Sequence, residues 1–275
     1  MPIEPIRPKV LSQAARAAFE ARCRLAQLDP ANPWVGGYVD YEWDHLRHIL
    51  MCVPAGLHGR KVLEFGCNVG ALAIVCAALG AEVSAVDVSA DYVDIARLNA
   101  QQYGLAGTSF HHIADGAALP FPDACFDVVI CNSVLEYVDA ARLAMVQREI
   151  DRIVAPGGLI LVTGTSNRLW PVEVHSRKWM VNYLPRRFDG WFGRPMQRGV
   201  WPWSVRRGFG SRYRNLDMPA FDGIFVTSRR KIGTSAAYLR LLLLLALLMR
   251  VGPGLLPRNL FCLLRKQAID DGRGC

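Results

Sequence analysis

Residues 62–70 read Val-Leu-Glu-Phe-Gly-Cys-Asn-Val-Gly, and this stretch decides the fold of the chain. A short apolar run leads into a turn with two glycines, and the residues that follow have the pattern of a buried, Ala-rich helix. Glycine lets a ligand approach the backbone closely, and the N–H groups at a helix N-terminus point toward such a ligand. The stretch therefore predicts a strand, a ligand-binding turn and a helix in direct succession.

The spacing of the glycines disfavours a dinucleotide as the ligand of this turn. A dinucleotide fingerprint needs glycines at positions 66, 68 and 71, and these positions read Gly66, Asn68 and Ala71. Glu64, two residues before the first glycine, is expected to accept hydrogen bonds from the turn and to hold its shape. A nicotinamide or flavin cofactor is therefore not expected.

Outward from this turn, short apolar runs alternate with helical patterns. We expect strands at residues 61–65, 82–87, 108–113, 126–131 and 158–163, and helices at residues 70–79, 89–103 and 139–154. Repeated strand–helix units predict a mostly parallel sheet with helices on both faces. Right-handed crossovers then place the loops that follow the strands at the carboxyl edge of the sheet, where ligands bind.

The two ends of the chain add further elements. We expect helices at residues 12–28, with Ser12 as the N-cap, and at residues 42–52, joined by an aromatic, Gly-rich loop at 32–41. The apolar side of the first helix is expected to comprise Ala14, Ala18, Leu25 and Leu28. The apolar segment 259–264 is expected to form a last edge strand of the sheet.

The composition indicates one globular domain. The chain has 275 residues, a formal net charge of +8, 52% hydrophobic residues and 20% charged residues, which excludes intrinsic disorder. The first ten residues contain no apolar run, so no secretory signal peptide is expected. The eight cysteines include no Cys-x-x-Cys pair, which favours a reducing cytoplasm over a disulfide framework.

Polar landmarks follow the predicted strands in order. They are Asp87 at the end of the second strand, Asp115-Gly116 after the third, Asn132 after the fourth, and the Pro156-Gly157-Gly158 turn before the fifth. Each of these residues lies beside a predicted strand end, where ligands bind in α/β sheets. The weaker alternative is a different nucleotide-binding α/β domain that carries the same residues at these positions by coincidence.

With these landmarks, the sequence resembles the class I S-adenosylmethionine-dependent methyltransferases, especially the small-molecule group that includes the ubiquinone-type enzymes. Glu64, Gly66 and Gly70 match the first motif of the family, and Asn68 stands at its usual middle glycine. Asn tolerates a left-handed backbone better than most residues, so the turn is expected to keep its shape. The resemblance implies a Rossmann-like α/β fold with a mostly parallel, seven-stranded sheet and helices on both faces.

The resemblance also implies the cofactor and its contacts. S-adenosylmethionine is expected as the cofactor, with S-adenosylhomocysteine as the product. Asp87 would accept hydrogen bonds from the ribose hydroxyls, Asp115 would contact the adenine amino group, and Asn132 would face the methionine portion. The expected cofactor-binding residues are Glu64, Gly66, Cys67, Gly70, Asp87, Val88, Asp115, Gly116 and Asn132.

The candidate catalytic residues are His175, Glu173 and Glu136. A hydroxyl acceptor usually needs a general base within hydrogen-bond reach, and His175 follows the fifth predicted strand in an Asn-Arg…Pro…Glu…His pattern that recurs in related methyltransferases. The alternative is that Glu173 and His175 only pin this loop, and that Glu136 either stabilises a loop or touches the cofactor. The family often has Glu-His where this chain has Glu136-Tyr137, so a catalytic histidine is absent there. No metal site is expected.

Two segments after the fifth strand suggest a partner. Residues 166–214 contain eleven basic and two acidic residues, a balance of +9, and many aromatics, which suits either nucleic acid or a membrane interface. The nine apolar residues 241–249 cover only about half of a bilayer's hydrocarbon core. We expect the two segments to form a monotopic face over residues 177–250 that collects an amphiphilic or lipid-linked acceptor. The alternative is a core helix beside an arginine-rich surface loop.

These patterns predict four segments: an N-terminal helical cap (1–55), a cofactor-binding core (56–165), a basic aromatic insert (166–235), and a Leu-rich helix with a final strand (236–275). The leading hypothesis is a methyltransferase that acts on an oxygen of a small or lipid-linked metabolite, in the cytoplasm or peripherally on the cytoplasmic face of the membrane. An RNA-binding protein or RNA methyltransferase is the alternative, although nucleic acid is the less favoured partner. A third hypothesis is a cofactor-binding scaffold without turnover.

Overall fold

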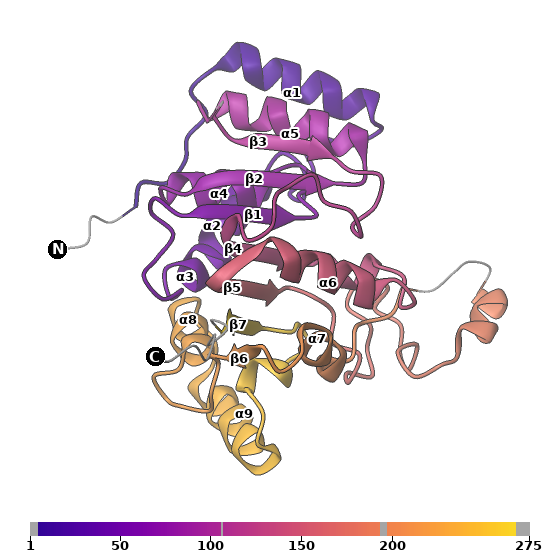
Figure 1. Cartoon of the computed structure of the whole chain (residues 1–275). Coiled ribbons are helices and arrows are strands. Elements are labelled where there is room, and N and C mark those ends of the chain that lie inside the picture. Colours follow the sequence, from indigo (N-terminus) through magenta and orange to yellow (C-terminus); the bar gives the residue numbers. More distant parts are fainter. Residues whose placement is uncertain (1–4, 106, 193–196, 268–275) are drawn as a thin grey trace. The chain divides into compact units, whose positions relative to one another are not determined.

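The computed structural model describes residues 5–105, 107–192 and 197–267 (Figure 1). The chain divides into two compact units. Unit 1 comprises Met1–Pro120 and Thr227–Thr234, and unit 2 comprises Phe121–Val226 and Ser235–Cys275.

The first helix of unit 1, α1 (Gln13–Leu25), begins where the sequence predicts. The Ser12 Oγ accepts a hydrogen bond from the Ala15 N–H at 3.2 Å and so caps the helix. The predicted apolar side is wrong: Phe19 and Cys23 are the buried residues, one turn apart, and α1 packs with them toward α5. Ala14, Ala18 and Leu25 are exposed and Leu28 is partly exposed. A phenylalanine buries more apolar area than an alanine, so Phe19 decides which face turns inward.

The second helical region begins earlier than predicted. Helix α2 (Tyr38–His45) starts inside the expected loop 32–41, and α3 (Arg47–Leu50) follows after a break at Leu46. Val39, Glu42 and Trp43 are buried in α2 at helical spacing. The glycines at 36 and 37 suggest a longer loop in the sequence, but burial of Trp43 favours a helix from Tyr38 onward.

The predicted strands of unit 1 and the two helices between them are confirmed. Its parallel strands are β1 (Lys61–Phe65), β2 (Glu82–Asp87) and β3 (Ser109–His112), and its helices between them are α4 (Ala71–Ala78) and α5 (Ala90–Gln102). The first six residues of α4 are all buried, which explains its uniformly apolar sequence. Ser89 caps α5 through its Oγ, which accepts from the Tyr92 N–H at 3.3 Å.

Unit 2 holds the remaining four strands. They are β4 (Phe126–Asn132), β5 (Val154–Thr163), β6 (Tyr213–Asn215) and β7 (Cys262–Lys266). Strands β4 and β5 are parallel, whereas β7 is antiparallel to both β5 and β6. The strand predicted at 259–264 is present but starts three residues later, as β7, and it is not an edge strand, because the three-residue strand β6 pairs along it. A segment as short as β6 has too few residues to show an alternating pattern.

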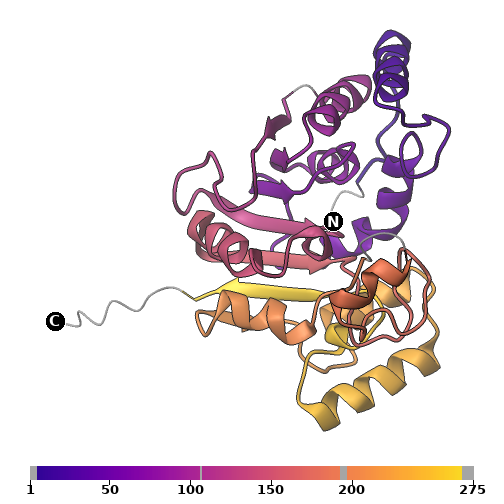
Figure 2. The same cartoon turned by 90° about the vertical axis from the view of Figure 1, so that its right-hand side faces the viewer.

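The seven strands have the order β3-β2-β1-β4-β5-β7-β6, so the predicted seven-stranded, mostly parallel sheet is confirmed. The other elements are η1 (Leu135–Tyr137), α6 (Leu143–Ile153), η2 (Arg186–Phe192), α7 (Pro202–Phe209), α8 (Ile224–Lys231), α9 (Ala236–Met249) and η3 (Pro253–Leu255). Within unit 2, both views show α9 at the outer side, away from β4 and β5 (Figures 1 and 2).

Helix α9 carries the leucine-rich run. It buries the side chains of Leu239, Leu242, Leu243 and Ala246 and exposes most of the others. The helix is thus neither wholly a core helix nor wholly a surface helix. In the part of the chain that the structure describes, no helix is both long and apolar enough to cross a membrane.

Candidate cofactor turn and histidine site

The turn between β1 and α4 has three residues in the left-handed region. Their φ angles are +80° at Gly66, +49° at Asn68 and +75° at Gly70. The expectation that Asn68 adopts this conformation in place of a glycine is confirmed. At Gly70 a Cβ atom would lie 2.9 Å from the Ala96 Cβ and 3.1 Å from the Phe110 ring, so only glycine fits between turn and neighbours.

Asp87, at the carboxyl end of β2, holds the turn of residues 66–70 in place through hydrogen bonds to the backbone. Its Oδ2 accepts from the Asn68 N–H at 2.8 Å and its Oδ1 accepts from the Ser89 N–H at 2.9 Å. The backbone N–H groups of Gly66 and Cys67 both donate to the Val86 carbonyl at 2.9 Å. Because each carboxylate oxygen accepts two hydrogen bonds, Asp87 keeps the capacity to accept two further hydroxyl groups.

Glu64, on β1, is a buried carboxylate. Burial raises its pKa well above the usual value, and the charges of Glu42 and Asp87 raise it further, while the Ala73 N–H donates to it and opposes the rise. Its Oε2 is buried and has no hydrogen-bond partner. Glu64 therefore accepts from the first turn of α4, and a cation near its second oxygen would stabilise the charged form. S-adenosylmethionine carries positive charge on its sulfonium and amino groups, so these residues fit it.

The other predicted cofactor residues lie on loops or strand ends. Cys67 is buried with its Sγ 3.7 Å from the Asn68 carbonyl, and Val88 is 59% exposed directly after β2. In unit 1, Asp115 Oδ1 accepts from the Ala117 N–H at 2.7 Å and bends the chain around Gly116.

Asn132 belongs to unit 2, where it ends β4. A Cβ atom at Gly164 would lie 2.5 Å from the Asn132 Oδ1, so this amide packs directly against the backbone that follows β5. Asn132 and the turn of residues 66–70 belong to different units.

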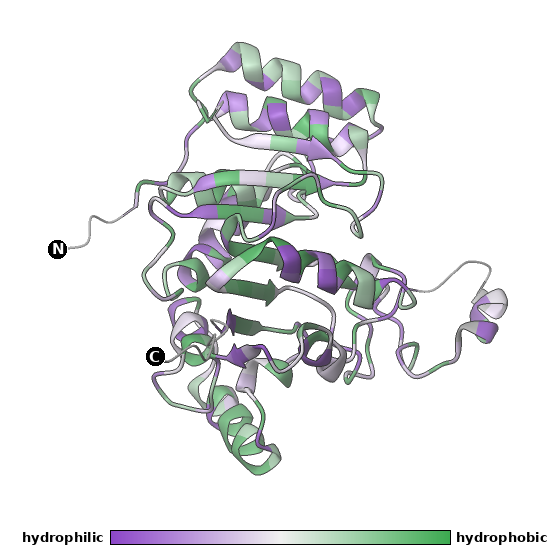
Figure 3. Cartoon of the chain, in the orientation of Figure 1, coloured by the Kyte–Doolittle hydropathy of each residue, from purple (hydrophilic) through white to green (hydrophobic). Residues whose placement is uncertain are grey.

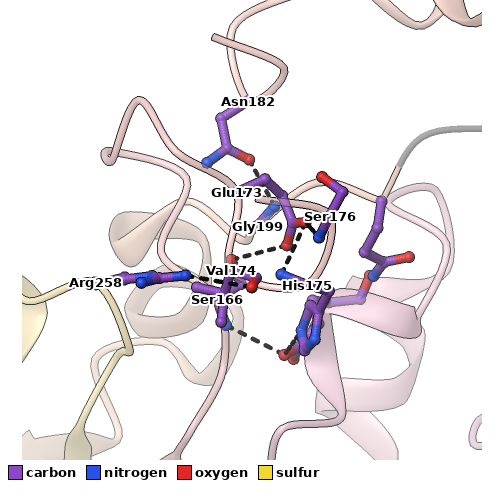
Figure 4. Close-up of polar contacts among 10 residues, drawn as sticks. Ser166, Glu173, Val174, His175, Ser176, Asn182, Gly199 and Arg258 are labelled. Atoms are coloured by element: carbon purple, nitrogen blue, oxygen red, sulfur yellow. Dashed lines mark hydrogen bonds and ion pairs between the residues drawn. The ribbon is translucent and has the colours of Figure 1, made fainter. Parts of the chain in front are cut away.

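A cluster in unit 2 brings together all three candidate catalytic residues, and Figure 4 labels two of them, Glu173 and His175. His175 Nε2 lies 3.3 Å from Glu136 Oε1, which also accepts from the Ser166 N–H at 3.2 Å. The Glu136 side chain is wholly buried, and its Oε2 has no hydrogen-bond partner. The Gln197 amide donates to the Glu136 carbonyl at 2.6 Å and holds the short helix η1 in place.

Glu173 holds the turn that carries His175. It is fully buried, and its Oε2 accepts from the His175 N–H at 3.0 Å and from the Ser176 N–H at 2.6 Å (Figure 4). Its Oε1 lies 3.4 Å from the Ser166 hydroxyl, which donates to it. These contacts make Glu173 a positioning residue, because all of them fix the backbone or a neighbouring side chain.

The surroundings of His175 suit a proton acceptor. Hydrogen bonding to Glu136 raises the pKa of His175, and the charges of Glu136 and Glu173 add to this, against partial burial and the charge of Arg258. A third of the His175 side chain (34%) is exposed. With Glu136 as acceptor, we assign the proton to Nε2, which leaves Nδ1 as the ring atom that takes a proton. The Tyr137 ring lies 5.5 Å from the imidazole, centroid to centroid.

Ser166, Gln197 and Tyr137 complete this cluster, and sequence reasoning does not find them. They contact residues up to 61 positions away, and no periodic pattern links them to Glu136. The sequence singles out Tyr137 only because it stands at position 137, where the family resemblance implies a histidine after the glutamate.

Comparison with known proteins identifies the domain. Residues 63–162 match the family described as a methyltransferase domain. Residues 63–162 thus form a methyltransferase domain, and the chain resembles the class I S-adenosylmethionine-dependent methyltransferases. The methyltransferase domain implies S-adenosylmethionine as the cofactor, as the resemblance of the sequence predicts.

Curated relatives of this chain are named ubiquinone biosynthesis O-methyltransferase. The protein of Pseudomonas aeruginosa (strain LESB58) is 34% identical over 152 residues, which is 54% of this chain and 64% of that protein. The protein of Paracidovorax citrulli is 27% identical over 187 residues, or 67% and 72% of the two chains. A third relative, from Proteus mirabilis, is covered over 53% of its length, so the chain spans between about half and three quarters of these relatives.

Solved structures share the fold of this chain. An S-adenosylmethionine-dependent methyltransferase from Mesorhizobium loti has a TM-score of 0.52 at 20% identity, over 82% of this chain and 97% of that one. The [4+2]-cyclase SpnF has a TM-score of 0.51 at 17% identity, over 82% of each chain. Because a protein described as a cyclase has the same fold, the fold alone does not decide the reaction.

Proposed function

We propose that the protein transfers a methyl group from S-adenosylmethionine to an oxygen atom of a small acceptor. The turn at residues 66–70 carries this proposal, because Asp87 holds its left-handed backbone and Glu64 presents a buried, unpartnered carboxylate oxygen beside it. When bound, S-adenosylmethionine supplies a methyl group on a sulfonium leaving group. The protein then has mainly to hold the cofactor and align the acceptor.

We assign the cofactor contacts as follows. Asp87 accepts hydrogen bonds from the ribose hydroxyls with the lone pairs that Asn68 and Ser89 leave open. Glu64 stabilises the positive charge of the methionine portion. The other contacts are made by Gly66, Cys67, Gly70, Val88, Asp115, Gly116 and Asn132.

His175 is the proposed general base. Its Nδ1 takes the proton of the acceptor hydroxyl as the oxygen forms its bond to the methyl carbon and the carbon–sulfur bond breaks, so that the sulfonium becomes a neutral thioether. Glu136 holds the imidazole in the required tautomer and stabilises the imidazolium that forms. Glu173 keeps the turn of His175 in place.

The names of the curated relatives favour oxygen as the methylated atom and a small molecule as the acceptor. We propose further that this acceptor is amphiphilic or lipid-linked and is taken up at the cytoplasmic face of a membrane, with residues 177–250 as the contacting segment. The outward leucines of α9 support this part of the proposal.

The RNA alternative receives less support from the basic insert. The Arg198 side chain is only 5% exposed and donates to both carboxylate oxygens of Asp189. Arg212 pairs with Asp151 on α6. The Arg168 guanidinium lies 5.2 Å from the Trp201 ring, which stacks on Trp203 at 4.7 Å. These cations and rings are used inside unit 2, which leaves fewer of them for phosphates and bases.

The test is transfer of a labelled methyl group. Purified protein is incubated with methyl-labelled S-adenosylmethionine and a lipid extract of its host, and binding of cofactor and product is measured by calorimetry. We expect binding of both and label in an organic-soluble ether. Binding with no transfer to any fraction would favour the scaffold hypothesis, and label in RNA would favour the nucleic-acid alternative. Absence of cofactor binding would refute the proposal.

A further inference from the structure

Helix α9 has two opposed apolar stripes. The stripe that packs into unit 2 consists of Leu239, Leu242, Leu243 and Ala246. The second stripe, which we call the bare stripe, consists of Leu241, Leu244, Leu245 and Leu248. Both stripes repeat at i, i+3, i+4 and i+7, and a shift of two residues places them on opposite sides of the helix. Figure 3 shows α9 almost entirely as hydrophobic residues.

The bare stripe is open to solvent. Its leucine side chains are between 39% and 73% exposed, and Leu247 and Met249 beside it are exposed to 58% and 57%. Single exposed leucines are ordinary, but a continuous row along one helix indicates a surface that is covered by a partner. The buried stripe already anchors α9 to its own unit, so the bare stripe is not needed for folding.

The positive charges beside the bare stripe indicate which partner covers it. Arg240 and Arg250 flank the stripe, and both are exposed. A stripe of leucines with arginines at its borders matches a bilayer of anionic lipid, in which the leucines enter the acyl region and the arginine stems reach the headgroups.

We propose that α9 is the element that attaches this protein to membranes, lying flat on an anionic bilayer with the bare stripe in the lipid. At 14 residues and about 1.5 Å per residue the helix is about 21 Å long, too short to span the hydrocarbon core but sufficient to lie in its plane. The inference rests on the proposed function for its purpose, because a surface-bound enzyme reaches a lipid-linked acceptor without extracting it. The inference narrows the proposed membrane contact from residues 177–250 to one side of helix α9.

The experiment is cosedimentation of the full chain with vesicles of phosphatidylcholine, with and without phosphatidylglycerol. We expect binding to the anionic vesicles that weakens as salt is raised. The triple variant Leu241→Ser, Leu244→Ser, Leu248→Ser is expected to bind at least about tenfold more weakly, because three apolar side chains leave the lipid. The matched control changes three exposed apolar residues elsewhere: Ile6→Ser, Leu25→Ser and Met145→Ser.

A charge variant tests the second half of the inference. Arg240→Gln is expected to weaken binding to anionic vesicles about fivefold and to leave binding to phosphatidylcholine unchanged. Lys9→Gln, which removes an exposed charge in unit 1, serves as its control. Equal losses from both charge variants would overturn the assignment to α9.

A second copy of the chain is the competing occupant. Light scattering that shows a dimer, converted to a monomer by the triple variant, together with no vesicle binding, would overturn the proposal. Calorimetry with S-adenosylmethionine on the same preparations separates the two claims. Normal cofactor binding without vesicle binding refutes only the membrane inference, whereas vesicle binding without cofactor binding refutes only the proposed function.

Discussion

Glu136 Oε1 lies 3.3 Å from His175 Nε2, although the two residues are 39 positions apart in the sequence. The family resemblance of the sequence implies a histidine directly after this glutamate, where the present chain has Tyr137. The imidazole that meets the glutamate here comes instead from the loop after β5. The carboxylate–imidazole pair is thus formed by two segments that lie far apart in the sequence.

The first prediction concerns this pair. Glu136→Gln removes the negative charge that raises the pKa of His175 but leaves an oxygen that accepts from Nε2 and from the Ser166 N–H. We expect the acidic limb of the pH–kcat profile to move to lower pH, because His175 then loses its proton more readily, and the maximal kcat to fall by about tenfold or more. NMR titration of the His175 ring measures the same shift directly.

The control for this variant is Glu82→Gln, which removes an exposed carboxylate at the start of β2. It is expected to change neither the ring titration nor kcat. If Glu136→Gln leaves the His175 titration where it is in the unmodified protein, then the carboxylate does not act on this imidazole.

The second prediction separates a base from a loop anchor. His175→Ala is expected to lower kcat by roughly 10²–10⁴-fold, the usual contribution of a general base, while the affinity for S-adenosylmethionine stays within about twofold. Its backbone N–H still donates to Glu173, so the turn is expected to remain. Steady-state kinetics and calorimetry measure the two effects. Full activity in this variant would show that the acceptor needs no base from His175.

The third prediction concerns cofactor binding. Asp87→Asn keeps one oxygen for the backbone but removes the charge-assisted hydrogen bonds to the ribose, at a cost of roughly 1.5–3 kcal/mol. Calorimetry with S-adenosylmethionine should therefore show a Kd raised by about 10- to 150-fold. The thermal unfolding curve of the variant checks that the turn survives. Unchanged affinity in a folded variant would remove Asp87 from the cofactor site.

The fourth prediction concerns a buried acid away from the site. Asp217 is 1% exposed and accepts from the Phe225 and Gly254 N–H groups, and burial raises its pKa to about 6. Because the folded state holds this proton more tightly than the unfolded state, whose aspartates titrate near about 4, stability falls as pH rises from about 4 to about 6. We expect Asp217→Asn to gain about 2 kcal/mol relative to the unmodified protein over that interval.

Urea denaturation at several pH values between 4 and 7 measures this difference. Only the change in the stability difference with pH is diagnostic, since the amide also alters the hydrogen bonds to the backbone. A difference that stays constant over the interval would mean that Asp217 does not titrate there.

Local pattern alone predicts much of the framework. The boundaries of β1 and β2 follow from their apolar runs, the start of α1 from Ser12, and the left-handed turn from Gly66, Asn68 and Gly70. These features depend on neighbours within a few positions, so they can be predicted from the local sequence. The wrong side chosen for α1 and the missed strand β6 show the limit: the burial of Phe19 and the pairing of β6 with β7 depend on segments far along the chain.

The sequence by itself determined the order of strands and helices, the cofactor turn and the residue types that could do the chemistry. Only the tertiary structure decided that Glu173 holds a turn while His175 meets Glu136, and that α9 buries one row of leucines and leaves another open. The physical reason is the same in both cases. Hydrogen bonds and burial between distant segments depend on how the backbone folds back on itself, and leave no periodic trace in the order of residues.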